Sequence, residues 1–297
     1  MQFGLSEEQT LLLDNVNRFL DDNSPLDRVR AYADGGDDAD IWAGLAELGV
    51  SALLIPEAQG GIGLNPLDAA IVAQSLGAHI TPSPFLGTAV MAPTALMASG
   101  GQYDDLLTEI AAGTLRVGIA FSEAIKRRND AQVEARDGAL FGKSLFAFDA
   151  DADSYLVADQ KQHLYLVAAD DPGLTRTHLT TVDKTRRTVE LTYDNAAAQS
   201  VSTDVRVFES VLDIGRVAIA ADTMGAAQNM LDQAVEYAKQ REQFNRPIGS
   251  FQAVKHMCAE MAAQLEPCRS MVWFAGHALA ELPEEARVTA CHTKAHL

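Results

Sequence analysis

Two helical segments joined by a short polar junction constrain this chain most strongly, and they lie between Arg216 and Leu279. The first segment, about residues 216–240, is rich in alanine and glycine, so another helix can approach it closely. In the second segment, apolar or small residues recur at steps of three and four, as in a helix that packs along its neighbours: Val254, Cys258, Met261, Leu265, Cys268, Val272, Ala275 and Leu279. The sequence therefore predicts a helical bundle in this part of the chain.

The junction REQFNRPIGSFQ separates the two segments. Pro247 and Gly249 interrupt the helical pattern, so the junction should form a turn. The junction gathers two cations, two amides and an aromatic ring: Arg241, Gln243, Phe244, Arg246 and Gln252. These groups can bind a ligand, but they supply no catalytic acid or base.

Composition and charge exclude several classes of protein. The chain has 297 residues, of which 47% are hydrophobic and 22% charged, which is typical of a soluble globular protein. Its net charge of −18 repels a phosphate backbone, so we expect no nucleic-acid partner. It has no run of 18 apolar residues, and MQFGLSEEQT at its start does not read as a signal peptide, so we expect no membrane span and no export.

The cysteines indicate the compartment. Cys258, Cys268 and Cys291 are odd in number and lack CxxC spacing. This pattern favours reduced thiols over disulfides or a zinc site. We therefore expect a cytoplasmic protein without a metal site.

The hydrophobic period changes along the chain and predicts an α+β fold. Ser6 followed by Gln9 is a capping box that starts an amphipathic helix, and helical patterns continue to about Ala112. From Arg116 the period approaches two, and a turn signal at Asp137-Gly138 favours a β-hairpin. The runs that predict strands are RVGIAF, AQVEAR, ALFGKSLFAF, SYLVAD, HLYLVAA and TVELTY. We expect an N-terminal helical domain over 1–115, a middle β domain over 116–208 and a C-terminal helical bundle over 209–297.

The string REQFNRPIGSFQAVKHMCAEM resembles the REQFGxPIxxFQxxxxxxAxM motif of acyl-CoA dehydrogenases, which share the same order of helical, β and helical domains. A second family motif in the N-terminal domain, LGxxxLxxPExxGGxG, is matched by Leu48, Gly49, Pro56, Glu57, Gly60, Gly61 and Gly63. The resemblance implies that Arg241, Gln243, Phe244 and Gln252 bind the FAD of a neighbouring subunit. It also implies that Asp213 and Arg216, which match a (F/L)DxxR motif, lie near the substrate; an ion pair at a helix start is the alternative for these two.

The chain departs from the family at the flavin pocket. Where the family reads TEPGAGSD, this chain has Ser122-Glu123-Ala124-Ile125-Lys126-Arg127-Arg128-Asn129, so bulky or cationic side chains replace small glycines. The family's KxWIT strand aligns with Lys143, Leu145, Phe146 and Ala147, which lack its tryptophan and its threonine hydroxyl. The basic residues Lys126, Arg127 and Arg128 are either solvated surface, a cover over a disused flavin site, or a contact for an acidic partner.

The resemblance also leaves the chain without a catalytic base. The reaction needs a carboxylate that removes the α-proton of the acyl-CoA. At one family position for this glutamate, directly before Arg216, the chain has Gly215; the other position lies beyond Leu297. We therefore expect no catalytic residue in these 297 residues, and no complete set of the family's final helices.

These matches and losses together predict the base-lacking subunit of a heteromeric FAD-dependent acyl-CoA dehydrogenase. The family members that it resembles most are α2β2 enzymes of steroid side-chain catabolism. Their pattern implies a homologous subunit as partner, a bulky acyl-CoA as substrate, FAD shared across the interface and electron-transfer flavoprotein as acceptor. The alternatives are a homo-oligomeric fatty acyl-CoA dehydrogenase whose base lies beyond residue 297, a flavin-free structural paralogue, and a flavin monooxygenase on the same scaffold.

Overall fold

The computed structural model describes residues 4–126, 128 and 131–297. The chain forms two compact units, one of Met1–Leu26, Pro66–Thr81 and Arg216–Leu297, the other of Asp27–Asn65 and Pro82–Gly215. Helix α8 (Val205–Gln240) contributes residues to both. The division into three consecutive domains remains a prediction.

The first unit is helical. Its first helix begins with the predicted capping box, because Ser6 Oγ accepts from Gln9 N at 3.1 Å and Gln9 Oε1 accepts from Ser6 N at 3.0 Å. Besides the later part of α8, the unit contains α1 (Glu7–Asn23), α4 (Pro66–Ala78), β9 (Glu242–Gln243), β10 (Arg246–Pro247), η4 (Ile248–Ser250), α9 (Gln252–Glu281) and α10 (Pro283–His296).

Glycines bring α4 and α8 into close contact, as the small residues of the 216–240 segment predict. A Cβ on Gly225 would lie 1.9 Å from the carbonyl oxygen of Gln74, and one on Gly77 would lie 2.0 Å from that of Asp222. Any side chain at these two positions would collide with backbone, so only glycine permits this approach.

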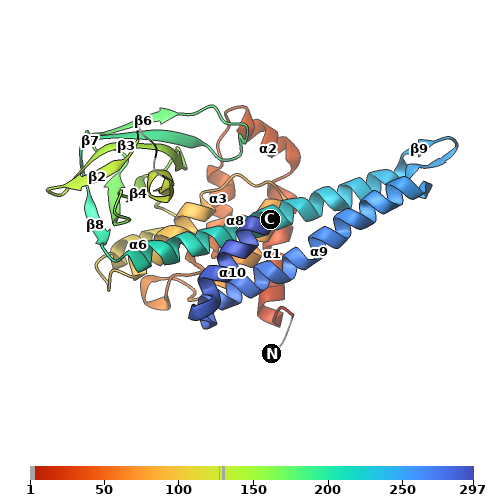
Figure 1. The fold of residues 1–297 in the computed structure, drawn as a ribbon, viewed down its shortest axis with the longest axis horizontal. Coiled ribbons are helices and arrows are strands. Elements are labelled where there is room, and N and C mark those ends of the chain that lie inside the picture. The colour runs from red at the N-terminus through yellow and green to blue at the C-terminus, as the bar shows by residue number, and fades with distance from the viewer. Residues whose placement is uncertain (1–3, 127, 129–130) are drawn as a thin grey trace. The chain divides into compact units, whose positions relative to one another are not determined.

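The apolar seam of α9 is buried over only part of its length. Leu265, Cys268, Val272 and Ala275 are buried, whereas Met261 is exposed. In Figure 1 the last turns of α8 and the first turns of α9 run side by side to the hairpin marked β9. Further from the hairpin, Arg269 Nη2 of α9 donates to Gln228 Oε1 of α8 at 3.2 Å. Further apolar side chains on this helical pair are exposed: Met230, Tyr237 and Met257.

The start of α8 differs from the prediction. The helix begins at Val205 and not near residue 216. Asp204 caps it, since Asp204 Oδ1 accepts from Arg206 N at 2.9 Å. Phe208 and Val211 are buried three residues apart, so the added turns are held by packing. Asp213 and Arg216 consequently lie inside a helix and not at its start.

The second unit combines helices with a sheet. Besides the first turns of α8, its helical elements are α2 (Leu26–Ala33), α3 (Ala39–Glu47), η1 (Val50–Ala52), η2 (Glu57–Gln59), the π-helix η3 (Leu86–Met91), α5 (Ala92–Met97), α6 (Asp104–Ala111) and α7 (Ser122–Ile125). Its strands are β1 (Val117–Ala120), β2 (Val133–Arg136), β3 (Ala139–Phe148), β4 (Ser154–Ala158), β5 (Leu164–Ala168), β6 (Leu174–His178), β7 (Thr188–Ala197) and β8 (Gln199–Ser202).

These strands form one sheet, in the order β6-β7-β3-β1-β4-β5-β8, with β2 paired to β3. Only the β1–β4 pair is parallel among the described strands. All six predicted strands are present. The Asp137-Gly138 hairpin is also confirmed, with both residues at positive φ and Arg136 opposite Ala139. The sequence missed β6 and β8, because LTRTH and QSVS are mostly polar.

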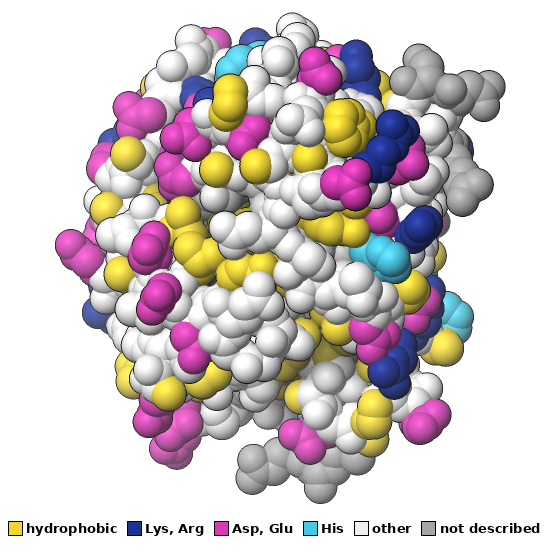
Figure 2. Space-filling model, turned by 90° about the vertical axis from the view of Figure 1, so that its left-hand side faces the viewer, with side chains coloured by type: hydrophobic (Ala, Val, Ile, Leu, Met, Phe, Trp, Pro, Cys, Tyr) yellow, Lys and Arg dark blue, Asp and Glu magenta, His cyan; other side chains and the backbone are white. Residues whose placement is uncertain are grey.

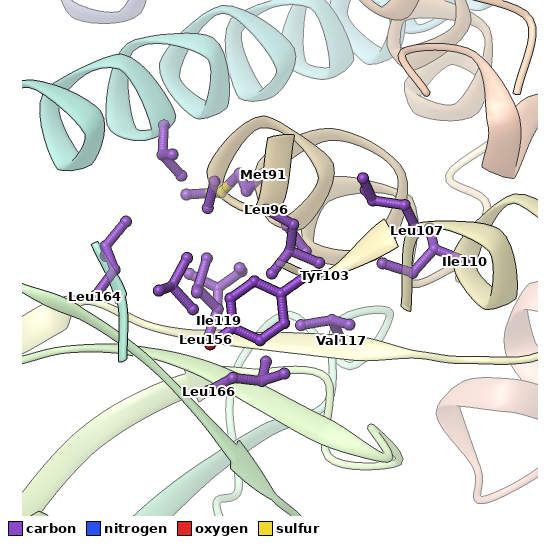
Figure 3. Packing of buried hydrophobic residues seen from close by; sticks show 14 of the residues in the cluster. Met91, Leu96, Tyr103, Leu107, Ile110, Val117, Ile119, Leu156, Leu164 and Leu166 are labelled. Carbon is purple, nitrogen blue, oxygen red and sulfur yellow. The ribbon is translucent and has the colours of Figure 1, made fainter. Parts of the chain in front are cut away.

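The sheet has a buried cluster on each face, which follows from the alternation of side chains along a strand. On β4, Tyr155 and Val157 belong to one cluster, whereas Leu156 and Ala158 belong to the other. Figure 3 shows the second cluster, in which side chains of η3, α5 and α6 pack on β1, β4 and β5.

The π-helix η3 lies against the edge of this cluster. Val117 N donates to Thr88 Oγ1 at 2.9 Å, and a Cβ on Gly87 would lie 2.4 Å from the Val117 carbonyl oxygen. η3 is therefore fixed on β1, and its last residue, Met91, is buried in the same cluster (Figure 3).

The surface agrees with the acidic composition. On the face shown in Figure 2, Asp and Glu side chains are spread among apolar and uncharged polar ones. Among the described residues, we find no helix with the length and apolar character needed to span a bilayer. The α+β class is confirmed.

Candidate functional site

Of the four residues expected to bind FAD, Gln243 and Phe244 lie in one hairpin, Arg241 directly precedes it and Gln252 begins α9. Strands β9 and β10 pair antiparallel with Gln243 opposite Arg246, so Phe244 and Asn245 form a two-residue turn. Both turn residues have positive φ, 53° and 59°. A type I′ turn requires this geometry but strongly favours glycine, and a bulky residue there is an outlier. The turn therefore holds Phe244 in a conformation that its side chain disfavours.

The backbone around Arg241 is fixed although its side chain is exposed. Arg241 N donates to Tyr237 O at 2.8 Å, and Arg241 O accepts from Ile248 N at 2.7 Å. A Cβ on Gly249 would lie 2.9 Å from Ala238 O, so the chain after the hairpin packs tightly on α8. The guanidinium of Arg241 forms no ion pair with any other described residue. Its charge is available to a ligand.

Aromatic contacts support the hairpin. The guanidinium of Arg246 lies 4.0 Å from the ring centre of Phe251, and the rings of Phe244 and Phe251 meet edge to face at 6.1 Å. Phe244 is still 87% exposed. At the start of α9, the Nε2 atoms of Gln252 and His256 are 3.4 Å apart.

This arrangement fits part of a FAD molecule. An unpaired guanidinium suits a pyrophosphate, the amides of Gln243 and Gln252 can donate to oxygens, and an exposed ring can cover an aromatic group. The four side chains are exposed, so they can hold FAD that another subunit also contacts.

In the segment that replaces the family's glycines, Glu123 binds the described side chains of Ser122 and Arg128. Glu123 is 2% exposed; its Oε2 accepts from Ser122 Oγ at 2.5 Å and its Oε1 from Arg128 Nη1 at 3.3 Å. The guanidinium of Arg128 also lies 5.4 Å from the ring centre of Phe146, and Phe146 N donates to Ser122 Oγ at 3.4 Å. Arg128 is thus bound to its own loop and to β3.

The second described basic residue of that loop, Lys126, is not covered in the same way. Lys126 is exposed, and Arg127 and Asn129 lie outside the described residues. On β3, Lys143 Nζ pairs with Glu190 at 2.6 Å, Ala147 is buried and Phe146 is half-exposed. Leu145 is partly buried.

Gly215 lies against Met91, a contact that the sequence did not predict. A Cβ on Gly215 would lie 2.9 Å from Met91 Sδ and 3.1 Å from Met91 Cε. Both residues are buried, and Figure 3 shows Met91 beneath the α8 ribbon. The backbone of α8 at Gly215 therefore has no room for a side chain while Met91 keeps this position.

The two residues expected near the substrate are inside α8. Asp213 is buried and Arg216 is half-buried, and each has an interaction partner within the chain. They belong to different compact units. Their role near a substrate therefore remains a prediction.

Comparison with known proteins identifies the family. Residues 6–114 match the sequence model of the acyl-CoA dehydrogenase N-terminal domain, and residues 205–296 match that of the C-terminal domain. The chain is 35% identical to acyl-CoA dehydrogenase IpdE2 of Mycobacterium tuberculosis, over 92% of this chain and 76% of IpdE2.

Two solved structures share its fold. A variant of the Tcur3481–Tcur3483 steroid ACAD superposes with a TM-score of 0.84 at 28% identity, over 98% of this chain and 86% of that one. The ChsE4–ChsE5 complex of Mycobacterium tuberculosis gives 0.85 at 25% identity, over 100% of this chain and 87% of that one. The chain therefore belongs to the acyl-CoA dehydrogenase family.

Proposed function

We propose that this chain is the subunit of a heteromeric FAD-dependent acyl-CoA dehydrogenase that contributes to its partner's FAD site and does not supply the catalytic base. The observation that carries the proposal is the contact between Gly215 and Met91. The family's carboxylate on α8 would be the side chain of residue 215, which is a glycine here. The end of the Met91 side chain packs where the Cβ of that carboxylate residue would lie.

Nearby carboxylates are poor replacements for that base. A base must reach the α-carbon of the substrate in its ionised form. Glu123 is buried and held by Ser122 and Arg128, and Asp213 is buried inside α8 with an interaction of its own. In this proposal the partner supplies the carboxylate, and FAD, when bound, would supply the hydride acceptor.

The contacts of Arg128 support the view that this chain does not bind a complete FAD of its own. Backbone amides can approach a flavin closely where glycines leave room. Here Arg128 lies between Glu123 and Phe146, and β3 offers Leu145 and Ala147 in place of a tryptophan and a threonine. Of the three roles open for the basic residues, these contacts favour a cover over the disused site for Arg128.

The remaining parts of the proposal rest on the relatives. A steroid ACAD and the heteromeric ChsE4–ChsE5 complex share this fold at 28% and 25% identity. We therefore infer a homologous partner subunit in an α2β2 assembly, a bulky steroid-type acyl-CoA as substrate, and electron-transfer flavoprotein as acceptor. Three free cysteines suit a protein of the reducing cytoplasm.

The test compares the purified chain alone with its complex with a homologous subunit. Flavin absorbance per protein chain and dehydrogenation of steroid and fatty acyl-CoA esters are measured in both. We expect little flavin and no activity from the chain alone, and both in the complex. A flavin-saturated, active homo-oligomer would contradict the proposal and favour a self-sufficient enzyme; a stable complex without flavin would favour the structural paralogue.

A further inference from the structure

The second unit contains a cavity of about 410 Å³, which lies between the end of α2 and the loop that joins strands β6 and β7. Its wall combines aromatic and small residues of the α2 end with a polar loop: Tyr32, Ala33, Gly35, His178, Leu179, Thr180, Thr181, Lys184, Arg186, Arg187 and Thr188. The hairpin residues and Gly215 do not line this cavity.

The charge of this wall is opposite to that of the chain. The sequence has 41 Asp and Glu against 23 Lys and Arg, yet among the described residues that line the cavity three are Lys or Arg and none is Asp or Glu. A concave surface lined by one sign of charge concentrates the field and attracts ions of the other sign. The cavity therefore favours an anion.

The loop keeps its own carboxylate out of the cavity. Asp183 Oδ1 accepts from Thr185 N at 2.9 Å and from Thr185 Oγ1 at 2.6 Å, and Asp183 O accepts from Thr181 Oγ1 at 2.6 Å. Asp183 thus stabilises the loop that carries Lys184. The ammonium group of Lys184 has no ion pair or hydrogen bond with any residue that the structure describes.

Arg187 holds the β6–β7 loop to the end of α2, on the side of the cavity formed by Tyr32. Its guanidinium lies 4.2 Å from the ring centre of Tyr32, Nη1 pairs with Asp151 Oδ2 at 3.1 Å, and Nη2 donates to the carbonyl oxygens of Tyr32 and Gly36. The loop and the end of α2 are therefore linked, and the cavity exists before any ligand binds. A preformed site loses less entropy on binding.

We propose that this cavity binds the phosphate group of a small molecule. The ammonium group of Lys184 and the hydroxyl of Thr180 can donate to phosphate oxygens, and the hydrogen bonds of a charged donor to phosphate are strong. Lys184 binds the anion directly. Arg187 maintains the shape of the site, since its own donors are occupied by Asp151 and backbone oxygens.

The test is calorimetric titration of the full chain with inorganic pyrophosphate, against sodium chloride at matched ionic strength. We expect saturable binding of pyrophosphate that Lys184→Gln weakens about tenfold, the loss of one charge-assisted hydrogen bond. Lys161→Gln is the matched control, because Lys161 is an exposed lysine in the turn between β4 and β5.

Arg241→Ala is the second control, because the hairpin could also bind pyrophosphate. Binding that persists in Arg241→Ala and in Lys161→Gln but weakens in Lys184→Gln supports the proposal. No saturable binding by the wild type, equal binding by Lys184→Gln, or loss in Arg241→Ala would each overturn it. These outcomes do not depend on whether the chain supplies a catalytic base.

Discussion

Asp38 and Arg116 form a tight ion pair, in which both carboxylate oxygens accept from Arg116 Nη2 at 2.7 Å. The charges of Asp38 and Arg116 act on Asp149, but the carboxylate of Asp149 has fewer hydrogen-bond partners than that of Asp38. Its Oδ1 accepts from Asp151 N at 3.2 Å, whereas its Oδ2 is buried without a described partner. Burial raises the pKa of Asp149 to about 6, and the charge of Arg116 only partly opposes this.

This pKa predicts that Asp149 destabilises the folded chain at neutral pH. The pKa of Asp149 in the folded chain, about 6, exceeds the ordinary value of 3.8 for an aspartate. Protonated Asp149 therefore stabilises the fold below about pH 4, and this contribution is lost as the pH rises through 6. Asp149→Asn should raise the free energy of unfolding by about 2–3 kcal/mol at pH 8 and have little effect at pH 4. Asparagine also tolerates the φ of +65° found here.

Thermal unfolding of the two proteins across that pH range checks the prediction. The two proteins have all other titratable groups in common, so the difference between their Tm values reports the contribution of Asp149 alone. An Asn variant that is less stable at pH 8 than the wild type would show that the Asp149 carboxylate is compensated by Arg116.

Gly215 and Met91 should be energetically coupled. Gly215→Ala in a helix interior would normally stabilise the fold by about 1 kcal/mol. Here the new Cβ must displace the flexible end of the Met91 side chain, so we expect this gain to be cancelled. Met91→Ala alone should cost about 2–5 kcal/mol, because it leaves a cavity in the core. The double variant should cost at least about 1 kcal/mol less than the sum of the two. Denaturant unfolding measures this, and strictly additive losses would exclude the contact.

A glycine in the hairpin turn should make the folded chain more stable. Asn245 has φ of 59°, a conformation in which glycine is free of strain. We expect Asn245→Gly to stabilise the first unit by up to about 1 kcal/mol. Asn15→Gly in α1 is the control, since Asn15 is an exposed helical residue where glycine should cost about 0.5 kcal/mol. If both variants lose the same free energy of unfolding, the left-handed conformation of Asn245 is contradicted.

The sequence predicted those parts of the fold and site that are local in the chain. The strands of the sheet follow from alternation. Gln243 and Phe244 share one hairpin, and Arg241 and Gln252 lie shortly before and after it, because the four residues are close in the sequence. β6 was missed since LTRTH exposes almost all of its side chains. The early start of α8 carried only a weak local signal, the cap at Asp204.

Contacts between distant segments could not be predicted in this way. Met91 ends a π-helix, and only the docking of that helix on β1 brings it against Gly215. Arg128 likewise gains its role from Phe146 on β3. Met91 belongs to no motif. The sequence marked Arg128 as one of three basic residues but did not indicate which side chains it contacts.

Arg241 gives the most direct test of the proposed shared FAD site. Its backbone is held by Tyr237 and Ile248, and its exposed guanidinium forms no ion pair with the described residues, so a substitution should not disturb the hairpin. Arg241→Ala should remove charge-assisted contacts to the FAD pyrophosphate worth ~1.5–3 kcal/mol and weaken FAD retention in the complex by one to two orders of magnitude. Arg241→Lys should recover only part of this loss, because an ammonium group cannot form the two parallel hydrogen bonds of a guanidinium.

The measurements are FAD occupancy and dehydrogenation rate of the reconstituted complex, with gel filtration to confirm assembly. Lys255→Ala is the matched control, because Lys255 is an exposed cation in the first turn of α9 outside the hairpin. If Arg241→Ala loses FAD while Lys255→Ala retains it and both assemble, Arg241 binds the cofactor across the interface. If the Arg241→Ala complex keeps its flavin and its rate, the guanidinium only complements the C-terminal end of α8, where a cation gains ~0.3–1 kcal/mol, and other residues form the shared site.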